Sequence, residues 1–194
     1  MSDQHDDGDP DHRPIITRRL ILKTPTEDER DRAIGLAADP VVARNLAAAP
    51  GDYWRSGGRT LAVVSRSVRS TIGISGYGPM SDRPDAIEVA TWIGEAFWGR
   101  GYATEATQAV VDLAFADTGA TAVWCSNRVS NSRARRVIEK CGFQFRETGM
   151  VRSPVSLGAI PVERYVLERR NWASLKSWAS GTGEESDVAR DSRC

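Results

Sequence analysis

Residues 98–106 read WGRGYATEA and place Gly99 and Gly101 directly before a segment with helical spacing. Glycine has no Cβ, so its backbone can approach a ligand closely. The first N–H groups of a helix have no intrahelical acceptor, and the helix dipole gives that end a partial positive charge. This stretch therefore predicts a loop and helix start whose amide N–H groups receive an anion such as phosphate.

The spacing of the glycines separates this loop from two familiar phosphate loops. The run from Gly99 to Ala103 matches neither G-x-x-x-x-G-K-[ST] of nucleotide triphosphatases nor G-x-G-x-x-G of dinucleotide folds. Taken alone, a Gly-x-Gly at a helix start fits a tight turn as well as it fits a ligand site. The flanking segments are needed to decide.

Those flanking segments predict an α/β fold. AIEVATWIG, residues 86–94, alternates in the way of a strand with two distinct faces. Apolar residues at helical spacing follow the loop as far as Gly119, and TAVWCSN, residues 121–127, predicts the next strand. A strand, a helix and a strand in this order favour a crossover that makes the two strands parallel.

The rest of the body predicts further elements around this unit, and the outcome is a mixed sheet flanked by helices. In chain order they are a strand within 13–23, a helix opened by the capping-box pair Thr26 and Glu29, a short helix begun by Asp39 and Pro40, a hairpin of strands 59–66 and 70–77, a helix within 130–142, and closing strands at 143–148 and 160–169.

Composition and length favour one domain. The chain has 194 residues, of which 40% are hydrophobic and 27% charged, as in a soluble globular protein. We expect a folded domain over 14–176, with disordered polar tails at 1–13 and 177–194. The first residues are acidic where a secretory signal would be basic and then apolar, and no run is long enough to span a membrane, so a cytoplasmic location without membrane contact is predicted.

Charge and cysteine content argue against several partner classes. The 26 basic and 26 acidic side chains balance, which disfavours a nucleic-acid partner. Cys125, Cys141 and Cys194 lack metal-ligand spacing, so no metal is expected, and Cys125 and Cys141 fall at apolar positions of a predicted core.

A second motif lies downstream of the glycine loop, where residues 131–143 read N-x-x-A-x-R-V-I-E-K-C-G-F. The strand over 86–94, the loop W-G-R-G-Y-A-T-E-A and this helix motif, in this order, resemble the Gcn5-related N-acetyltransferase superfamily over about 150 residues. The resemblance is strongest to the branch that acetylates the N-termini of ribosomal proteins. It implies a mixed central sheet whose two parallel central strands splay apart.

The resemblance also implies acetyl-CoA as cosubstrate. Its pyrophosphate would bind the amides of the glycine loop, its pantetheine arm would pair with the strand end, and Asn131 would face it from the next helix. A cluster of four arginines (Arg128, Arg133, Arg135 and Arg136) is available for the 3′-phosphate, although such a run is often a solvated helix face. The expected cofactor-binding residues are Trp92, Ile93, Gly99, Arg100, Gly101, Tyr102, Ala103, Thr104, Asn131 and Arg136.

Acetyl transfer to a primary amine needs a base, and Glu88 is the candidate because it interrupts an apolar strand beside the expected cosubstrate. A structural strand carboxylate is the alternative reading of Glu88. The amide of Trp92 or Ile93 would stabilise the developing oxyanion. Two positions where relatives have a serine and a tyrosine, thought to protonate the thiolate, carry Ala134 and Ile138 here, so that role is unassigned.

The acceptor is expected to be an amine, either a protein N-terminus or a small molecule, and fold resemblance does not choose between them. Tyr53 and Trp54 lie in the loop where the acceptor should arrive, as pocket residues or as anchors of the loop. Two other functions stay open: a non-catalytic acyl-CoA-binding or regulatory module, and an RNA-associated protein that uses the arginine cluster. An exposed strand edge also leaves a homodimer open.

Overall fold

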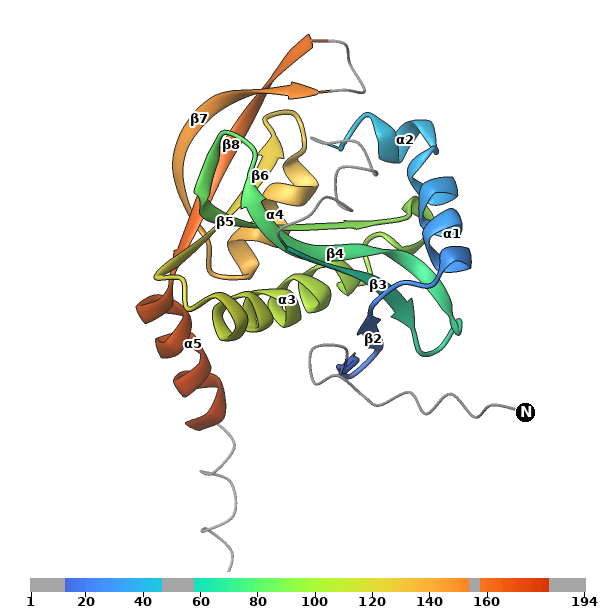
Figure 1. Ribbon diagram of the computed structural model, residues 1–194, viewed down its shortest axis with the longest axis horizontal. Coiled ribbons are helices and arrows are strands. Elements are labelled where there is room, and N and C mark those ends of the chain that lie inside the picture. Colours follow the sequence, from blue (N-terminus) through green and yellow to red (C-terminus); the bar gives the residue numbers. More distant parts are fainter. Residues whose placement is uncertain (1–12, 47–57, 154–157, 182–194) are drawn as a thin grey trace, which may run out of the picture.

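The computed structural model describes residues 13–46, 58–153 and 158–181 and has a mixed sheet flanked by helices (Figure 1). The strands are β1 (Ile15–Ile16), β2 (Leu20–Lys23), β3 (Arg59–Ser65), β4 (Ser70–Met80), β5 (Arg83–Ile93), β6 (Ala122–Arg128), β7 (Gln144–Ser153) and β8 (Gly158–Glu168). The helices are α1 (Glu27–Ala37), α2 (Pro40–Ala43), η3 (Glu95–Phe97), α3 (Tyr102–Thr118), α4 (Ser132–Lys140) and α5 (Arg169–Gly181).

The sheet confirms the predicted α/β class and its central crossover. Its eight strands follow the order β1-β2-β3-β4-β5-β6-β8-β7. β5 and β6 are parallel and are connected through α3, whereas every other neighbouring pair is antiparallel. The parallel pair therefore lies inside the sheet, at the place that the sequence predicts.

Helices cover both faces of the sheet, and a core lies beneath each layer. α3 packs on one face, where Val89 and Ile93 of β5 join Val110 and Phe115 in the larger core. α1 and α2 cover the opposite face, where Trp92 belongs to a smaller core. The alternation of residues 86–94 thus correctly predicts a strand with two distinct faces, and each face packs on a core.

The parallel strands separate soon after they meet. Their pairing is confined to Ile87 with Val123 and Glu88 with Trp124, although β5 continues to Ile93 and β6 to Arg128. β6 remains fully paired with β8 on its other side. Within the described ranges, the edge of β5 that faces β6 therefore has no strand partner beyond Glu88, and the sheet opens between the two strands.

Two elements differ from the sequence-based prediction. Residues 13–23 form a hairpin of two short antiparallel strands instead of one strand, because the chain reverses where the Thr17 amide donates to the Leu20 carbonyl at 3.0 Å. Helix α5 was not predicted. Its Trp172 ring lies 5.0 Å from the Phe115 ring, and Trp172 Nε1 donates to Asp112 at 2.7 Å, so contacts with α3 stabilise it.

Candidate functional site

The glycine loop leads into α3 with backbone geometry that suits glycine. Gly99 and Gly101 have φ of +75° and +78°, a region that other L-residues enter at a cost, and Gly101 is the N-cap of α3. No side chain caps this helix start. Among the described residues, no backbone acceptor is found for the amides of residues 99–104, whereas the next amide, of Glu105, donates to the Gly101 carbonyl at 3.1 Å. The amides are thus available to an external anion.

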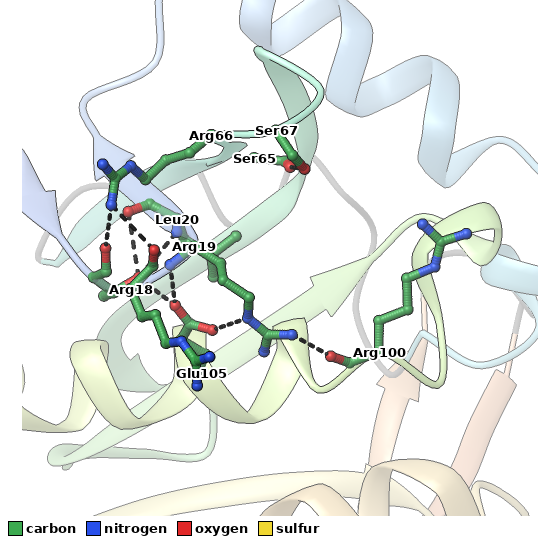
Figure 2. Close-up of polar contacts among 9 residues, drawn as sticks. Arg18, Arg19, Leu20, Ser65, Arg66, Ser67, Arg100 and Glu105 are labelled. Atoms are coloured by element: carbon green, nitrogen blue, oxygen red, sulfur yellow. Dashed lines mark hydrogen bonds and ion pairs between the residues drawn. The ribbon is translucent and has the colours of Figure 1, made fainter.

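The turn between β1 and β2 binds this loop through polar contacts of Arg19 (Figure 2). Arg19 donates from Nη1 to the Arg100 carbonyl at 2.7 Å and from Nε to the Glu105 carboxylate at 2.7 Å. Its guanidinium also lies 4.8 Å from the centre of the Tyr102 ring. Because Arg19 donates to the Arg100 carbonyl, the amide N–H of Gly101 in the same trans peptide group points away from the turn.

The negative charge of Glu105 is compensated by groups of the turn between β1 and β2. Burial raises the pKa of Glu105, but hydrogen bonds from the Thr17 hydroxyl and from the Arg19 amide and side chain outweigh burial and leave the pKa below its usual value. Tyr102 next to it has a lowered pKa, because the hydroxyls of Ser67 and Ser65 stabilise its ionised form. Glu105 is therefore an ionised structural carboxylate in the first turn of α3, where the helix dipole favours it.

A cavity of about 410 Å³ opens between the splayed strands and in front of the glycine loop. It is walled by the ends of β5 and β6, by the starts of α3 and α4, and by α2. Nine of the ten predicted cofactor-binding residues line it: Trp92, Ile93, Gly99, Gly101, Tyr102, Ala103, Thr104, Asn131 and Arg136. The structure thus brings together positions 40 residues and more apart in the chain.

The other predicted site residues lie elsewhere. Arg100 is exposed and does not line the cavity, since its carbonyl faces Arg19 and the cavity wall passes from Gly99 to Gly101. Glu88 lies just outside the lining, behind Ala90 on the same face of β5. Tyr53 and Trp54 lie outside the described residues.

The unpaired edge of β5 presents alternate backbone groups to the cavity. The Gly94 amide donates to the Ile72 carbonyl of the neighbouring segment at 2.8 Å, and Trp92 pairs with Ile74. Because backbone groups in an antiparallel ladder alternate in direction, the groups of Trp92 point to β4 and those of Thr91 and Ile93 point to the opening. Of the two amides considered for the oxyanion, the one that faces the opening is that of Ile93.

Trp98 joins the end of β5 to the loop. Its Nε1 donates to the Ile93 carbonyl at 2.6 Å, and the Arg133 guanidinium lies 5.2 Å from the centre of its ring. Both residues line the cavity. The tryptophan before the glycines thus fixes the loop relative to the strand end.

Asn131 and Asn127 form the α4 side of the cavity wall. Asn131 is the N-cap of α4, and its Oδ1 accepts from the Ala134 amide at 3.0 Å. Asn127 is 4% exposed and its amide nitrogen donates to the Arg128 carbonyl at 2.8 Å, but its Oδ1 has no partner among the described residues. Buried polar atoms normally have one, so this oxygen suits a donor on a ligand. Sequence reasoning missed Asn127 because a polar residue at a strand end carries no motif.

Glu88 has the surroundings of a perturbed acid. Burial raises its pKa, and the Ser126 hydroxyl and the Arg164 guanidinium offset this only in part. Arg164 on β8 is 4% exposed and pairs with Asp82 at 2.6 Å and with Glu147 at 3.3 Å. A carboxyl that is costly to ionise here accepts a proton more readily than an ordinary glutamate does.

The arginine cluster divides between structural and cavity roles. Arg128 donates to the Leu46 carbonyl at 2.9 Å, and Arg135 binds the Glu163 carboxylate with its Nε at 3.0 Å. Arg133 and Arg136 instead line the cavity together with Lys140. Among the residues that the structure describes, every charged residue of this lining is therefore basic, as an anionic ligand requires.

Comparisons with known proteins agree with this geometry. Residues 19–144 match the family described as "Acetyltransferase (GNAT) domain". The chain is 29% identical over 100 residues to the FsC-acetyl coenzyme A-N(2)-transacetylase of Aspergillus fumigatus, a match that covers 50% of this chain and 43% of that protein. The chain thus spans less than half the length of this curated relative.

Solved structures share the fold. A GNAT-family acetyltransferase from Bacillus anthracis has a TM-score of 0.67 at 15% identity, over 81% of this chain and 99% of that one. RimL, a ribosomal L7/L12 alpha-N-protein acetyltransferase in complex with coenzyme A, has a TM-score of 0.64 at 13% identity, over 79% and 96% of the two chains.

The chain belongs to the GNAT acetyltransferase domain family, since the family match covers well over half of its length. This confirms the family and the enzyme class, an acyltransferase, predicted from the sequence. Within the described ranges, no three His, Cys, Asp or Glu residues are placed to hold a metal ion. No described helix is long and apolar enough to cross a membrane.

Proposed function

We propose that this protein transfers the acetyl group of acetyl-CoA to a primary amine by direct attack of the amine on the thioester. The observation that carries the proposal is the opening between β5 and β6 beside a row of loop amides without backbone acceptors. Acetyl-CoA supplies an activated acyl group and a thiolate leaving group. The chain supplies binding, orientation and proton transfer.

The residues present fit this cosubstrate at three places along the cavity. The amides from Gly99 to Thr104 suit the pyrophosphate, because they combine free N–H groups with the dipole of a 17-residue helix. Arg136 and its basic neighbours suit the 3′-phosphate. The backbone groups of Thr91, which point to the opening, suit an extended amide chain such as pantetheine, which binds by strand addition.

Glu88 is the base in this proposal. An amine attacks only when neutral, so the protein must accept a proton from the incoming ammonium or amine, directly or through water. The raised pKa of Glu88 matches that task. The Ile93 amide, which points into the opening, is the donor for the developing oxyanion. Glu88 and the opening lie on neighbouring parts of β5, so base and acyl group come close together.

The identity of the amine acceptor is the most specific part of the proposal. RimL acts on a protein N-terminus and the Aspergillus relative is an N(2)-transacetylase, so a peptide N-terminus and a small amine are both candidates. The experiment is incubation with acetyl-CoA and a mixed pool of peptides with varied N-termini, aminoglycosides and polyamines. Thiol release reports turnover, and a mass gain of one acetyl group identifies the acceptor.

We expect thiol release that depends on an amine in the pool. Tight binding of acetyl-CoA without release across the whole pool would instead favour a non-catalytic acyl-CoA-binding module. The alanine and isoleucine at positions 134 and 138 make that second outcome the relevant alternative.

A further inference from the structure

The proposed transfer leaves a thiolate, and two positions of α4 that could protonate it carry apolar side chains. Ala134 and Ile138, at the two positions where relatives are thought to hold a proton donor, both line the cavity. Neither side chain has a polar hydrogen. A donor for the departing sulfur must come from another position or from solvent.

Ser126 lies on the opposite wall, where β5 and β6 separate. The last pair of the parallel ladder is Glu88 with Trp124, and Ser126 follows Trp124 by two residues, so it shares a face of the sheet with Glu88. Ser126 lines the cavity, and its Oγ is buried. Its hydroxyl is close enough to the Glu88 carboxyl to lower the pKa of that group, but within the described part of the chain no contact of this oxygen meets hydrogen-bond geometry. Buried hydroxyls normally have a well-formed partner, so this one suits a group on a ligand.

The carboxyl of Glu88 faces charged and polar groups from three elements. Ser126 on β6 and Arg164 on β8 lower its pKa, whereas Asp82 in the turn before β5 raises it, and burial is the largest influence. The charge of Glu88 in turn helps to raise the pKa of the buried Cys125 thiol. Ser126 is thus near enough to Glu88 to interact with it and also reaches the cavity.

We propose that the Ser126 hydroxyl is a catalytic residue that delivers a proton to the sulfur of the departing coenzyme A and is reprotonated by Glu88. This inference rests on the proposed function. It assigns to β6 the role that the side chains of Ala134 and Ile138 on α4 cannot perform.

The protons and electrons balance over the cycle. Glu88 accepts one proton from the ammonium, and the neutral nitrogen then forms a bond to the thioester carbon. The second nitrogen proton passes to solvent. The carbon–sulfur bond breaks with its electron pair on sulfur, Ser126 gives its proton to that sulfur, and Glu88 returns a proton to the Ser126 oxygen. The products are the amide, coenzyme A and one proton in solvent.

The test compares Ser126→Ala with Ser126→Thr, which keeps a hydroxyl on a strand-favouring residue, and with the control Ser132→Ala on the exposed start of α4. With the amine that the pool experiment identifies, we expect kcat of Ser126→Ala to fall about 100-fold, in the range of general-acid contributions, with an unchanged Kd for acetyl-CoA. Ser126→Thr should retain most of the turnover, and Ser132→Ala all of it.

A second readout needs no turnover. Carbon-13 NMR titration of the Glu88 carboxyl in the free protein should give a higher pKa in Ser126→Ala than in the wild type, because the hydroxyl that lowers this pKa is removed. An unchanged titration would overturn the proposed Glu88–Ser126 link.

The kinetic outcomes separate the two proposals. If the wild type is active and Ser126→Ala is equally active, only the Ser126 proposal fails. If Ser126→Ala and Ser126→Thr lose acetyl-CoA binding together with turnover, Ser126 is structural and the proposal is again overturned. If the wild type binds acetyl-CoA but releases no thiol with any amine, the proposed function fails and the Ser126 step with it.

Discussion

Glu88 combines burial with access to polar neighbours on β6 and β8, and this combination predicts how activity depends on pH. Its pKa is raised by burial, so kcat/KM should increase with pH through a limb above the usual glutamate range. Glu88→Gln should remove that limb and lower kcat about 100-fold or more, since a general base contributes 10²–10⁴-fold. Binding of acetyl-CoA should persist, because Glu88 does not line the cavity.

Steady-state kinetics from pH 5 to 9 and calorimetric titration of acetyl-CoA measure both effects. Glu95→Gln is the matched control, because Glu95 is exposed on η3 and is not part of the lining. Unchanged turnover of Glu88→Gln at every pH would remove Glu88 from the mechanism and favour a purely structural carboxylate.

The same residue predicts a stability effect of definite sign. A carboxyl whose folded-state pKa is raised favours folding while protonated, and that contribution is lost as pH rises through the folded-state pKa. Glu88→Gln stays neutral, so its melting temperature should exceed that of the wild type at pH 8 by more than at pH 4. Thermal denaturation of both proteins at the two pH values measures this difference. A difference between Glu88→Gln and the wild type that is no larger at pH 8 than at pH 4 would contradict the raised pKa.

The loop and its helix act as one element, and glycine substitutions separate their roles. Gly101 and Gly119 flank α3, with φ of +78° and +63°, so alanine at either costs about 1–2 kcal/mol from left-handed backbone. The Gly101 Cβ would also lie 3.3 Å from Arg19 Nη2, whereas nothing lies within 4 Å at Gly119. Gly101→Ala should therefore weaken acetyl-CoA binding, and Gly119→Ala should lower stability alone. Equal affinities of the two variants would separate the loop from the binding site.

Elements with their own pattern were predictable from the sequence, and those made by tertiary contacts were not. The alternation around Val89 and Trp92 correctly predicts β5, and the stop at Gly119 correctly ends α3. Helix α5 was not predicted because its stability comes from contacts such as that of Trp172 with Phe115, which are far apart in the chain. The turn between β1 and β2 was not predicted because the residue that it binds, Glu105, is remote in sequence.

In the whole molecule, one opening is surrounded by the loop, which the sequence predicts, and by polar wall residues, which it does not predict. Nine of the ten expected cofactor-binding residues line the cavity, since the loop and the α4 motif carry recognisable patterns. Asn127, Ser126 and Arg164 were not predicted, because their placement depends on the pairing of β6 with β5 and β8, and pairing register cannot be read from one strand. The significance of their polar atoms for a ligand becomes visible only from the separation of β5 and β6.

Every role proposed for the loop, for Glu88 and for Ser126 depends on acetyl-CoA binding at the loop and between the splayed strands. The most direct measurement is an acetyl-CoA titration followed in ¹H–¹⁵N correlation spectra of the labelled protein. We expect the largest shifts at the amides of residues 99–104, and shifts at Thr91 and Ile93 larger than at Trp92, whose amide faces β4. Absent shifts, or shifts gathered away from the loop and the edge of β5, would contradict this expectation.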